Sequence, residues 1–101
     1  MEKRCLSCSK DWTTLTITNL EQNKTLYINY CDIDRIEFDE IFIRKYLKKI
    51  RSEKIKIFTN KSTKPIEFSK HKHQKYYEEY KQELSKFAHD NRISIIDRII
   101  S

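Results

Sequence analysis

Residues 69–91, SKHKHQKYYEEYKQELSKFAHDN, decide the fold because they contain the clearest periodicity in the chain. With residues placed about 100° apart, the large side chains fall within an arc of roughly 120°, which is typical of a helix with one buried face. Ser69 is a suitable N-cap, and HDN at 89–91 is a suitable end. The pattern therefore predicts one C-terminal helix over residues 70–91, with a buried stripe of His73, Tyr76, Tyr77, Tyr80, Leu84, Phe87 and Ala88.

Upstream of this helix, residues 12–69 show the two-residue alternation of half-buried strands. Segment 44–52, RKYLKKIRS, fits either a helical turn or a long basic hairpin, and the pattern leaves both open. The predicted inward residues are Leu15 and Ile17 in 12–18, Leu26, Ile28 and Tyr30 in 25–30, Ile36 and Phe38 in a third strand, Ile41, Ile43 and Leu47 in 41–47, Ile55 and Ile57 in 53–59, and Ile66 and Phe68 in 65–68.

The order of strands followed by a helix predicts an α+β fold. We expect an antiparallel curled sheet, or a small two-sheet barrel, of five to seven short strands closed by the one C-terminal amphipathic helix. A chain of 101 residues fits one domain. Its expected parts are an N-terminal extension (1–11), the strands (12–69), the helix (70–91) and an apolar tail (92–101) that forms either a strand or a second short helix.

Three stretches carry a resemblance to a known family. LYINYCDIDRIEF at 26–38 runs through a turn into an alternating strand, and KIKIFTNKSTKPIEFS at 54–69 is a paired hairpin. YYEEYKQELSKFAHDN at 76–91 matches the closing helix. Over about residues 14–91 the chain resembles a bacterial pleckstrin-homology-like (PH-like) domain. The resemblance implies a two-sheet scaffold that binds proteins, peptides or lipid head groups, with no activity attached.

The positive charge is concentrated in one segment. Residues 44–75 carry twelve basic and two acidic side chains, whereas the whole chain has a net charge of +6. Such a stripe suits phosphates, anionic lipid head groups or an acidic protein surface, although lysines on a strand also serve simply to prevent sheet-to-sheet aggregation. The candidate binding residues in this stripe are Arg44, Lys45, Lys48, Lys49, Arg51, Lys54 and Lys56.

Lys70 and Lys72, together with Lys75, fall at the predicted start of the helix. Cations there oppose the helix dipole, at a cost of about 0.3–1 kcal/mol each at exposed positions. The same arrangement adds lysines to free backbone N–H groups, which favours an anion. Lys70 and Lys72 therefore join the candidate binding residues.

Several chemistries have little support in the composition. Glycine is absent, which excludes glycine-rich dinucleotide or phosphate loops. Cys5 and Cys8 form a CxxC that lacks a second ligand pair, and His71 and His73 diverge by about 200° on a helix. The acidic run at 31–40, CDIDRIEFDE, fits a solvated edge facing a turn. We expect no catalytic residues, no metal and no cofactor.

The sequence thus predicts a non-catalytic PH-like interaction module whose partner, most readily a protein, presents an acidic or anionic surface. Two alternatives stay open: a nucleic-acid-binding protein that uses the 44–75 basic segment, or a small phage or mobile-element inhibitor that covers a partner's binding or active site. Self-association through strand edges also stays open. The chain shows no apolar run of membrane-spanning length and no signal-peptide pattern, so we expect a cytoplasmic protein. The family resemblance and the inhibitor alternative imply a bacterial or phage origin.

Overall fold

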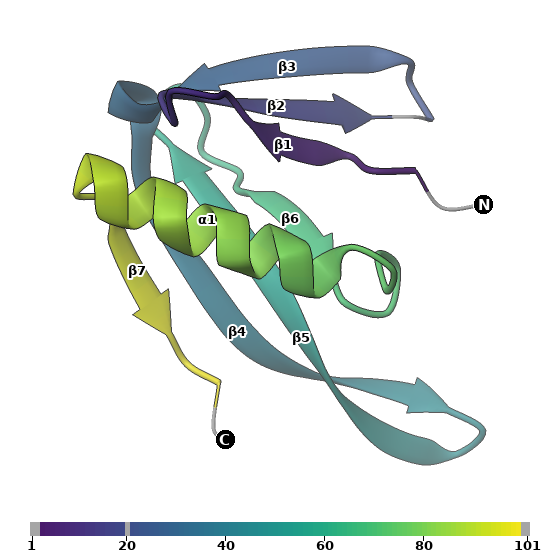
Figure 1. Cartoon of the computed structure of the whole chain (residues 1–101). Helices are drawn as coiled ribbons and strands as arrows, with labels where there is room; N and C mark the ends of the chain where they lie inside the picture. The colour runs from purple at the N-terminus through teal and green to yellow at the C-terminus, as the bar shows by residue number, and fades with distance from the viewer. Residues whose placement is uncertain (1–2, 20, 100–101) are drawn as a thin grey trace.

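The computed structural model describes residues 3–19 and 21–99 (Figure 1). Within them, β1, β2 and β3 form one sheet, and the second sheet has the order β6-β5-β4-β7. The α+β class, the two sheets and the C-terminal helix are confirmed. The elements are β1 (Leu6–Cys8), β2 (Thr14–Asn19), β3 (Lys24–Asn29), a short 3₁₀ helix (Tyr30–Asp32), β4 (Ile33–Lys45), β5 (Lys48–Thr59), β6 (Ile66–Ser69), α1 (Tyr77–Asn91) and β7 (Ser94–Asp97).

The two sheets are not closed into a barrel, since none of the strand pairs in the described residues links one sheet to the other. All neighbouring strands are antiparallel except β7, which runs parallel to β4 with Ile95 opposite Ile36. The purely antiparallel prediction is therefore wrong at this strand. The apolar tail, for which strand and helix were both open, forms β7.

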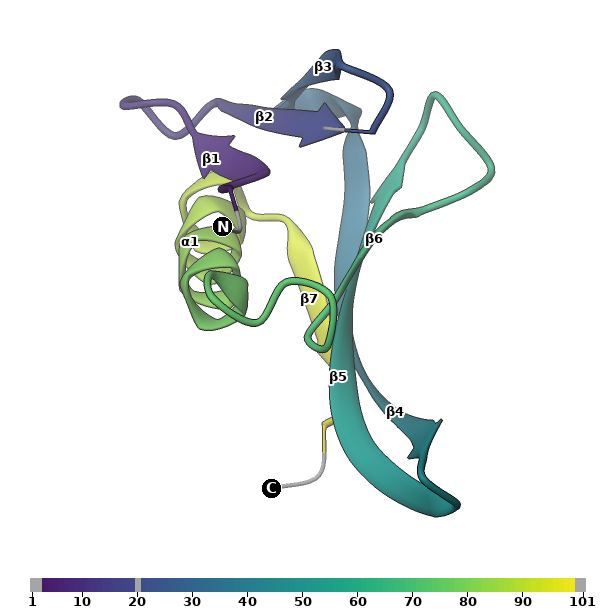
Figure 2. The ribbon, with the colours of Figure 1, turned by 90° about the vertical axis from the view of Figure 1, so that its right-hand side faces the viewer.

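Helix α1 supplies the centre of the core. Figures 1 and 2 show it along one face of the four-stranded sheet, with the three-stranded sheet across one end of that layer. Its buried residues are Tyr77, Tyr80, Leu84, Phe87 and Ala88, so this part of the predicted stripe is confirmed. They pack with Ile36, Phe38, Ile55, Ile57 and Phe68 of the four-stranded sheet and Leu6, Leu15, Ile17 and Ile28 of the three-stranded sheet.

The helix begins at Tyr77, so the predicted start after Ser69 is wrong. Ser69 ends β6, where it pairs with Lys54, and its carbonyl oxygen accepts hydrogen bonds from the backbone N–H groups of Lys72 and His73. The helix end is correct, because Arg92 adopts the left-handed conformation that closes the last turn. Glu78 and Glu79 occupy the first turn, where negative charge complements the helix dipole, whereas the lysines at 70–75 precede it.

Residues 1–11 were expected to be an extension, but β1 lies within them. Leu6 pairs with Ile17 and is almost completely buried. A strand of three residues is too short to produce a recognisable alternation, which explains why the sequence did not reveal it.

A single strand, β4, replaces the two predicted strands at 36–38 and 41–47. It turns into β5 at Tyr46 and Leu47, both of which have positive φ, as a two-residue hairpin turn of type I′ requires. The long hairpin is thus the correct alternative for 44–52. Leu47 consequently projects from the turn instead of lying beside Ile41 and Ile43.

Two other inward predictions fail, one in β3 and one in the 3₁₀ helix that follows it. The side chain of Leu26 is 51% exposed, and that of Tyr30 is exposed in the 3₁₀ helix. Leu26 belongs to β3, the outer strand of its sheet, whereas Ile28 on the same strand is buried. Alternation therefore predicted which face of β3 points toward the core. It did not predict that the core ends before Leu26.

The acidic run at 31–40 is not merely a solvated edge. Glu37 is buried, and its carboxylate accepts hydrogen bonds from Arg35 at 2.7 Å and from Arg98, which follows β7. Arg98 also donates to Asp39 at 2.9 Å, and its backbone N–H bonds to the carbonyl oxygen of Phe38. These contacts hold the end of the chain against β4.

No helix within residues 3–19 and 21–99 combines the length and the apolar character that crossing a membrane requires.

Replacing Leu84 by alanine should lower the free energy of unfolding by about 2–5 kcal/mol, because it removes a fully buried side chain between the two sheets. Urea denaturation followed by circular dichroism measures the change. Gln82→Ala, on the exposed side of α1, is the matched control and should change stability by less than about 0.5 kcal/mol. Equal effects of the two substitutions would contradict the assigned core.

Arg98→Gln should weaken the pH dependence of stability in acid. The hydrogen bond from Arg98, followed by that from Arg35, lowers the pKa of Glu37 below its usual value. A lowered pKa stabilises the fold above the unfolded-state pKa of about 4.3 and loses that contribution as the pH falls through the folded-state pKa. The variant should therefore have a lower free energy of unfolding than the parent at pH 7. The two free energies should converge at low pH.

Unfolding curves between pH 7 and pH 2 measure this difference. Lys10→Gln, which removes an exposed cation far from Glu37 along the chain, is the control. A difference between Arg98→Gln and the parent that stays constant down to the lowest pH would show that Arg98 does not act through the carboxylate.

Candidate functional site

The β4–β5 hairpin extends well beyond the helix (Figures 1 and 2). β6 stops pairing with β5 at Lys54, and β7 stops pairing with β4 at Phe38. Beyond these points, residues 40–53 form a two-stranded ribbon with no further described strand on either side. We call residues 40–53 the basic ribbon, because residues 41–52 carry five cations and no acid.

Four predicted cations occupy the outer half of the basic ribbon. Arg44 lies opposite Lys49, and Lys45 lies opposite Lys48. Side chains opposite each other share a face, and successive residues alternate, so one pair projects from each face. All four are exposed, and none forms an ion pair with another described residue. Like charges directly opposite each other destabilise a strand pair, so an anion bound here removes a cost.

Arg51 is also exposed on the basic ribbon, but its Nε lies 3.0 Å from an Oε atom of Glu40. Glu40 is the first residue of the basic ribbon and is followed by three uncharged residues. The fifth cation is thus partly neutralised, whereas the four at the outer half are not.

Lys54 and Lys56 project away from the core, as predicted, but they do not form a free stripe. Lys56 lies 3.2 Å from Asp39 of β4, and Lys54 forms an ion pair with Glu67 of β6. Both side chains are largely covered. The sheet brings these carboxylates alongside the lysines from strands distant in sequence, which local alternation does not show.

Lys70 and Lys72 lie in the turn that follows β6 and do not surround a helix N-terminus. Lys70 lies 4.0 Å from Glu53 and 3.3 Å from Glu78. Lys72 is exposed and has no ion pair with the described residues. Lys75 lies over the ring of Tyr76 at 5.2 Å from its centroid. The predicted anion site at the helix start is therefore not formed.

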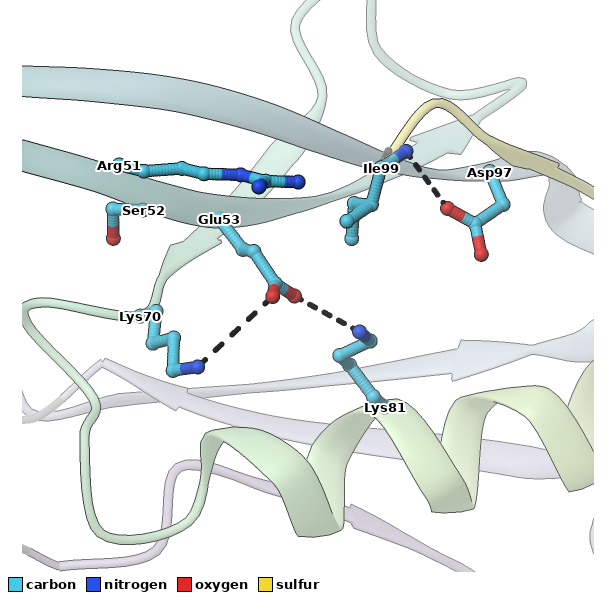
Figure 3. A pocket seen from close by; sticks show the side chains of 7 residues that line it. All are labelled: Arg51, Ser52, Glu53, Lys70, Lys81, Asp97 and Ile99. Carbon is cyan, nitrogen blue, oxygen red and sulfur yellow. Dashed lines mark hydrogen bonds and ion pairs between the residues drawn. The ribbon is translucent and has the colours of Figure 1, made fainter. Parts of the chain in front are cut away.

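Figure 3 shows the pocket at the base of the ribbon where Lys70 and Lys81 converge on Glu53. Lys81 Nζ donates to Glu53 Oε1 at 2.9 Å. The pocket measures about 560 Å³, and Asp97 and Ile99 from the end of the chain complete its lining. Glu53 consequently ties β5 to both α1 and the turn before it, and its charge is matched within the protein.

A second hollow of about 720 Å³ lies beside the basic ribbon. We call it the basic hollow, because the charged residues that line it are all cationic in the described part of the chain. Ribbon cations and the turn after β6 meet there, although they are about 20 residues apart in sequence. Its charged and titratable lining residues are Arg44, Lys45, Arg51, Lys70 and His71, with Gln74, Ile43, Ile50 and Ser52 between them.

The sequence pattern did not indicate that His71 and Gln74 belong to this surface. The side chain of His71 is exposed, and it belongs to no group of possible metal ligands among the described residues. His73 instead packs edge-on against Phe68, with ring centroids 5.3 Å apart. Only the turn that replaces the predicted helix start brings His71 near the ribbon.

The ribbon also ends in apolar side chains. Tyr46 is 88% exposed, Leu47 is fully exposed and Phe42 is 63% exposed. Large apolar groups that project into water from one hairpin tip are more typical of an interaction surface than of a solubility device.

The CxxC residues lie on and beside β1. Cys5 and Cys8 are both partly buried, and the Cys8 thiol contacts the carbonyl oxygen of Glu83 at 3.9 Å. Among the residues that the structure describes, no group of three histidines, cysteines or acids gathers to hold a metal ion.

In comparisons with known proteins, no family model, no curated protein and no solved structure matches the chain.

Alkylation should distinguish Cys8 from Cys31. Burial raises the pKa of the Cys8 thiol to about 11, although Arg4 nearby lowers it in part. At pH 8 about one Cys8 thiol in a thousand is then ionised, and the thiolate is the reactive form. Iodoacetamide followed by peptide mass spectrometry should find the exposed Cys31 modified well before Cys8.

Unfolding in urea is the control, because it should bring the two rates together. Modification of Cys8 as fast as Cys31 in the folded protein would contradict the burial of the β1 thiol.

Proposed function

We propose that this chain is a non-catalytic PH-like interaction module that binds an acidic surface of a partner protein through the basic ribbon. The observation that carries the proposal is the group of four cations, Arg44, Lys45, Lys48 and Lys49, which have no counter-charge among the described residues. Most other cations in the 44–75 segment that the sequence singled out are matched within the fold. A negatively charged partner surface would therefore gain the most favourable electrostatic contacts at the ribbon.

The arrangement of the chain is compatible with a PH-like scaffold. Six strands in two sheets precede one helix, the short strand β7 follows it, and the helix packs its aromatic stripe against both sheets. A scaffold of this kind holds a long hairpin rigidly at its base while leaving the tip exposed. This supports a binding role.

A protein partner is favoured over nucleic acid by the composition of the ribbon tip. Phe42, Tyr46 and Leu47 expose apolar surface between the cations. Buried aromatic anchors surrounded by polar groups are the usual composition of protein interfaces. Binding to a phosphate backbone, in contrast, draws mainly on a broad set of cations, and several cations here are already paired.

Charge reversal of Lys45 and Lys48 tests the proposal. The two lysines lie opposite each other near the tip, and neither forms an ion pair with another residue in the described part of the structure. K45E/K48E should weaken binding of a glutamate homopolymer by at least about tenfold, because opposite charges become like charges at close range. Fluorescence anisotropy at two salt concentrations measures the affinity and its salt dependence.

The matched control is K10E/K64E, which changes the net charge equally at two exposed positions away from the ribbon. It should keep the affinity within about twofold of the parent after correction for net charge. Equal losses in the two variants would mean that the ribbon is only a solubility device. Duplex DNA that binds through Lys45 and Lys48 while the glutamate polymer does not bind would assign the ribbon to nucleic acid.

A further inference from the structure

The edge of β5 is open along the basic ribbon. β5 lies between β4 and β6, and β6 ends its pairing where Ser69 meets Lys54. From residue 48 to residue 53, the side of β5 that faces away from β4 has no strand partner in the described chain. Among the described residues, the one backbone hydrogen bond on this side runs from the N–H of Lys70 to the carbonyl oxygen of Glu53, at 2.9 Å.

An open strand edge presents unpaired backbone donors and acceptors, and it is a template for another strand. Six residues of β5 span about 20 Å, which is enough for a typical strand. The neighbouring turn leaves room along this edge, because the basic hollow of about 720 Å³ is lined by Ile50, Arg51 and Ser52 on one side and by Lys70, His71 and Gln74 on the other.

The charge around this edge selects what can add to it. Arg44 and Lys45 line the hollow and form no ion pair with the residues that the structure describes, and Arg51 and Lys70 line it as well. No carboxylate from residues 3–19 or 21–99 lines it. A strand that carries acidic side chains would meet cations on each face of the ribbon, whereas a basic or neutral strand would bring no such compensation.

We propose that an extended acidic segment of the partner protein adds as a strand to β5 at residues 48–53 and places its carboxylates in the basic hollow. The inference rests on the proposed function and gives it a binding mode. Backbone hydrogen bonds along the open edge supply affinity, and the cations supply selection for acidic side chains.

A second copy of this chain is a poorer occupant of the same edge. Pairing two copies through β5 would place two basic ribbons side by side, each with five cations and no acid between residues 41 and 52. Like charges that oppose each other across strands are destabilising. The lysines thus discourage pairing between two copies while they favour an acidic strand. The same cations can therefore both bind a partner and prevent sheet-to-sheet aggregation.

The test uses an octapeptide of alternating glutamate and valine, capped at both ends, and two isomers in which either the glutamate or the valine amides are N-methylated. In an added strand, alternate residues direct their backbone N–H groups toward β5, and the others direct them away. The two isomers have the same charge and composition. One isomer should therefore lose at least about tenfold in affinity, while the other binds like the parent peptide.

Titration calorimetry or anisotropy gives the affinities, and amide hydrogen exchange gives the location. Bound peptide should slow exchange at residues 48–53, and it should leave exchange in β3, the open outer strand of the other sheet, unchanged. K45E/K48E should weaken the parent peptide and the tolerated isomer equally, because both use the same cations.

The outcomes separate this inference from the function on which it rests. Equal binding of both isomers, lost in K45E/K48E, would keep the acidic-partner function and overturn strand addition. Slowed exchange in β3 instead of β5 would also overturn it. Failure of every acidic probe to bind would overturn both proposals. Slowed exchange at residues 48–53 that follows protein concentration without peptide would assign the edge to a second copy.

Discussion

The structure depends on one buried contact, the packing of the aromatic stripe of α1 between two small sheets. Tyr77, Tyr80 and Phe87 are fully buried, and they contribute the largest side chains of the core. Neither sheet could bury its apolar face alone, because one has three short strands and the other is covered only where the helix lies. Each sheet therefore relies on the same helix, which links the folding of the N-terminal strands to that of residues 77–91.

The extent of this core sets the boundary between the scaffold and the surface available for binding. Ile55 and Ile57 are buried beneath the helix, whereas Ile50, on the same strand, is exposed. β4 and β5 continue past the helix as a twisted ribbon that is held by its own hydrogen bonds (Figures 1 and 2). A ribbon without a core has little reason to be apolar at its tip, so the exposure of Tyr46 and Leu47 supports the proposed binding role.

The body of the molecule and the basic ribbon differ in how far their cations are paired with acids. Over the body, cations meet acids from neighbouring strands, as Lys56 meets Asp39 and Arg98 meets Glu37. Glu53 marks the boundary, because it engages Lys70 and Lys81 where the ribbon leaves the helix (Figure 3). Beyond Glu40 and Arg51 the pairing stops. Four unmatched cations, Arg44, Lys45, Lys48 and Lys49, thus lie together at one projecting end, which supports the proposed binding role.

Much of the fold could be predicted from the sequence, because periodicity reports which face of an element is buried. The stripe from Tyr77 to Ala88, the inward Ile55 and Ile57, and the position of the basic segment all follow from local patterns. The start of the helix, the three-residue β1 and the parallel β7 could not be predicted, since each depends on a partner distant in sequence. The same is true of the candidate site, where Lys54 and Lys70 look like Lys45 and Lys48 until the strands bring Glu67 and Glu53 beside them.

By itself, the sequence determined the α+β class, the buried helix face and the location of the positive charge, because spacing and composition are properties of the chain. Only the tertiary structure decided which cations remain unmatched and that an open strand edge lies beside them. Ion pairs and sheet edges are relations between segments that local sequence does not bring together. The physical reason is that an electrostatic contact depends on distance in space, and in this protein the sheet order and the end of β6 set those distances.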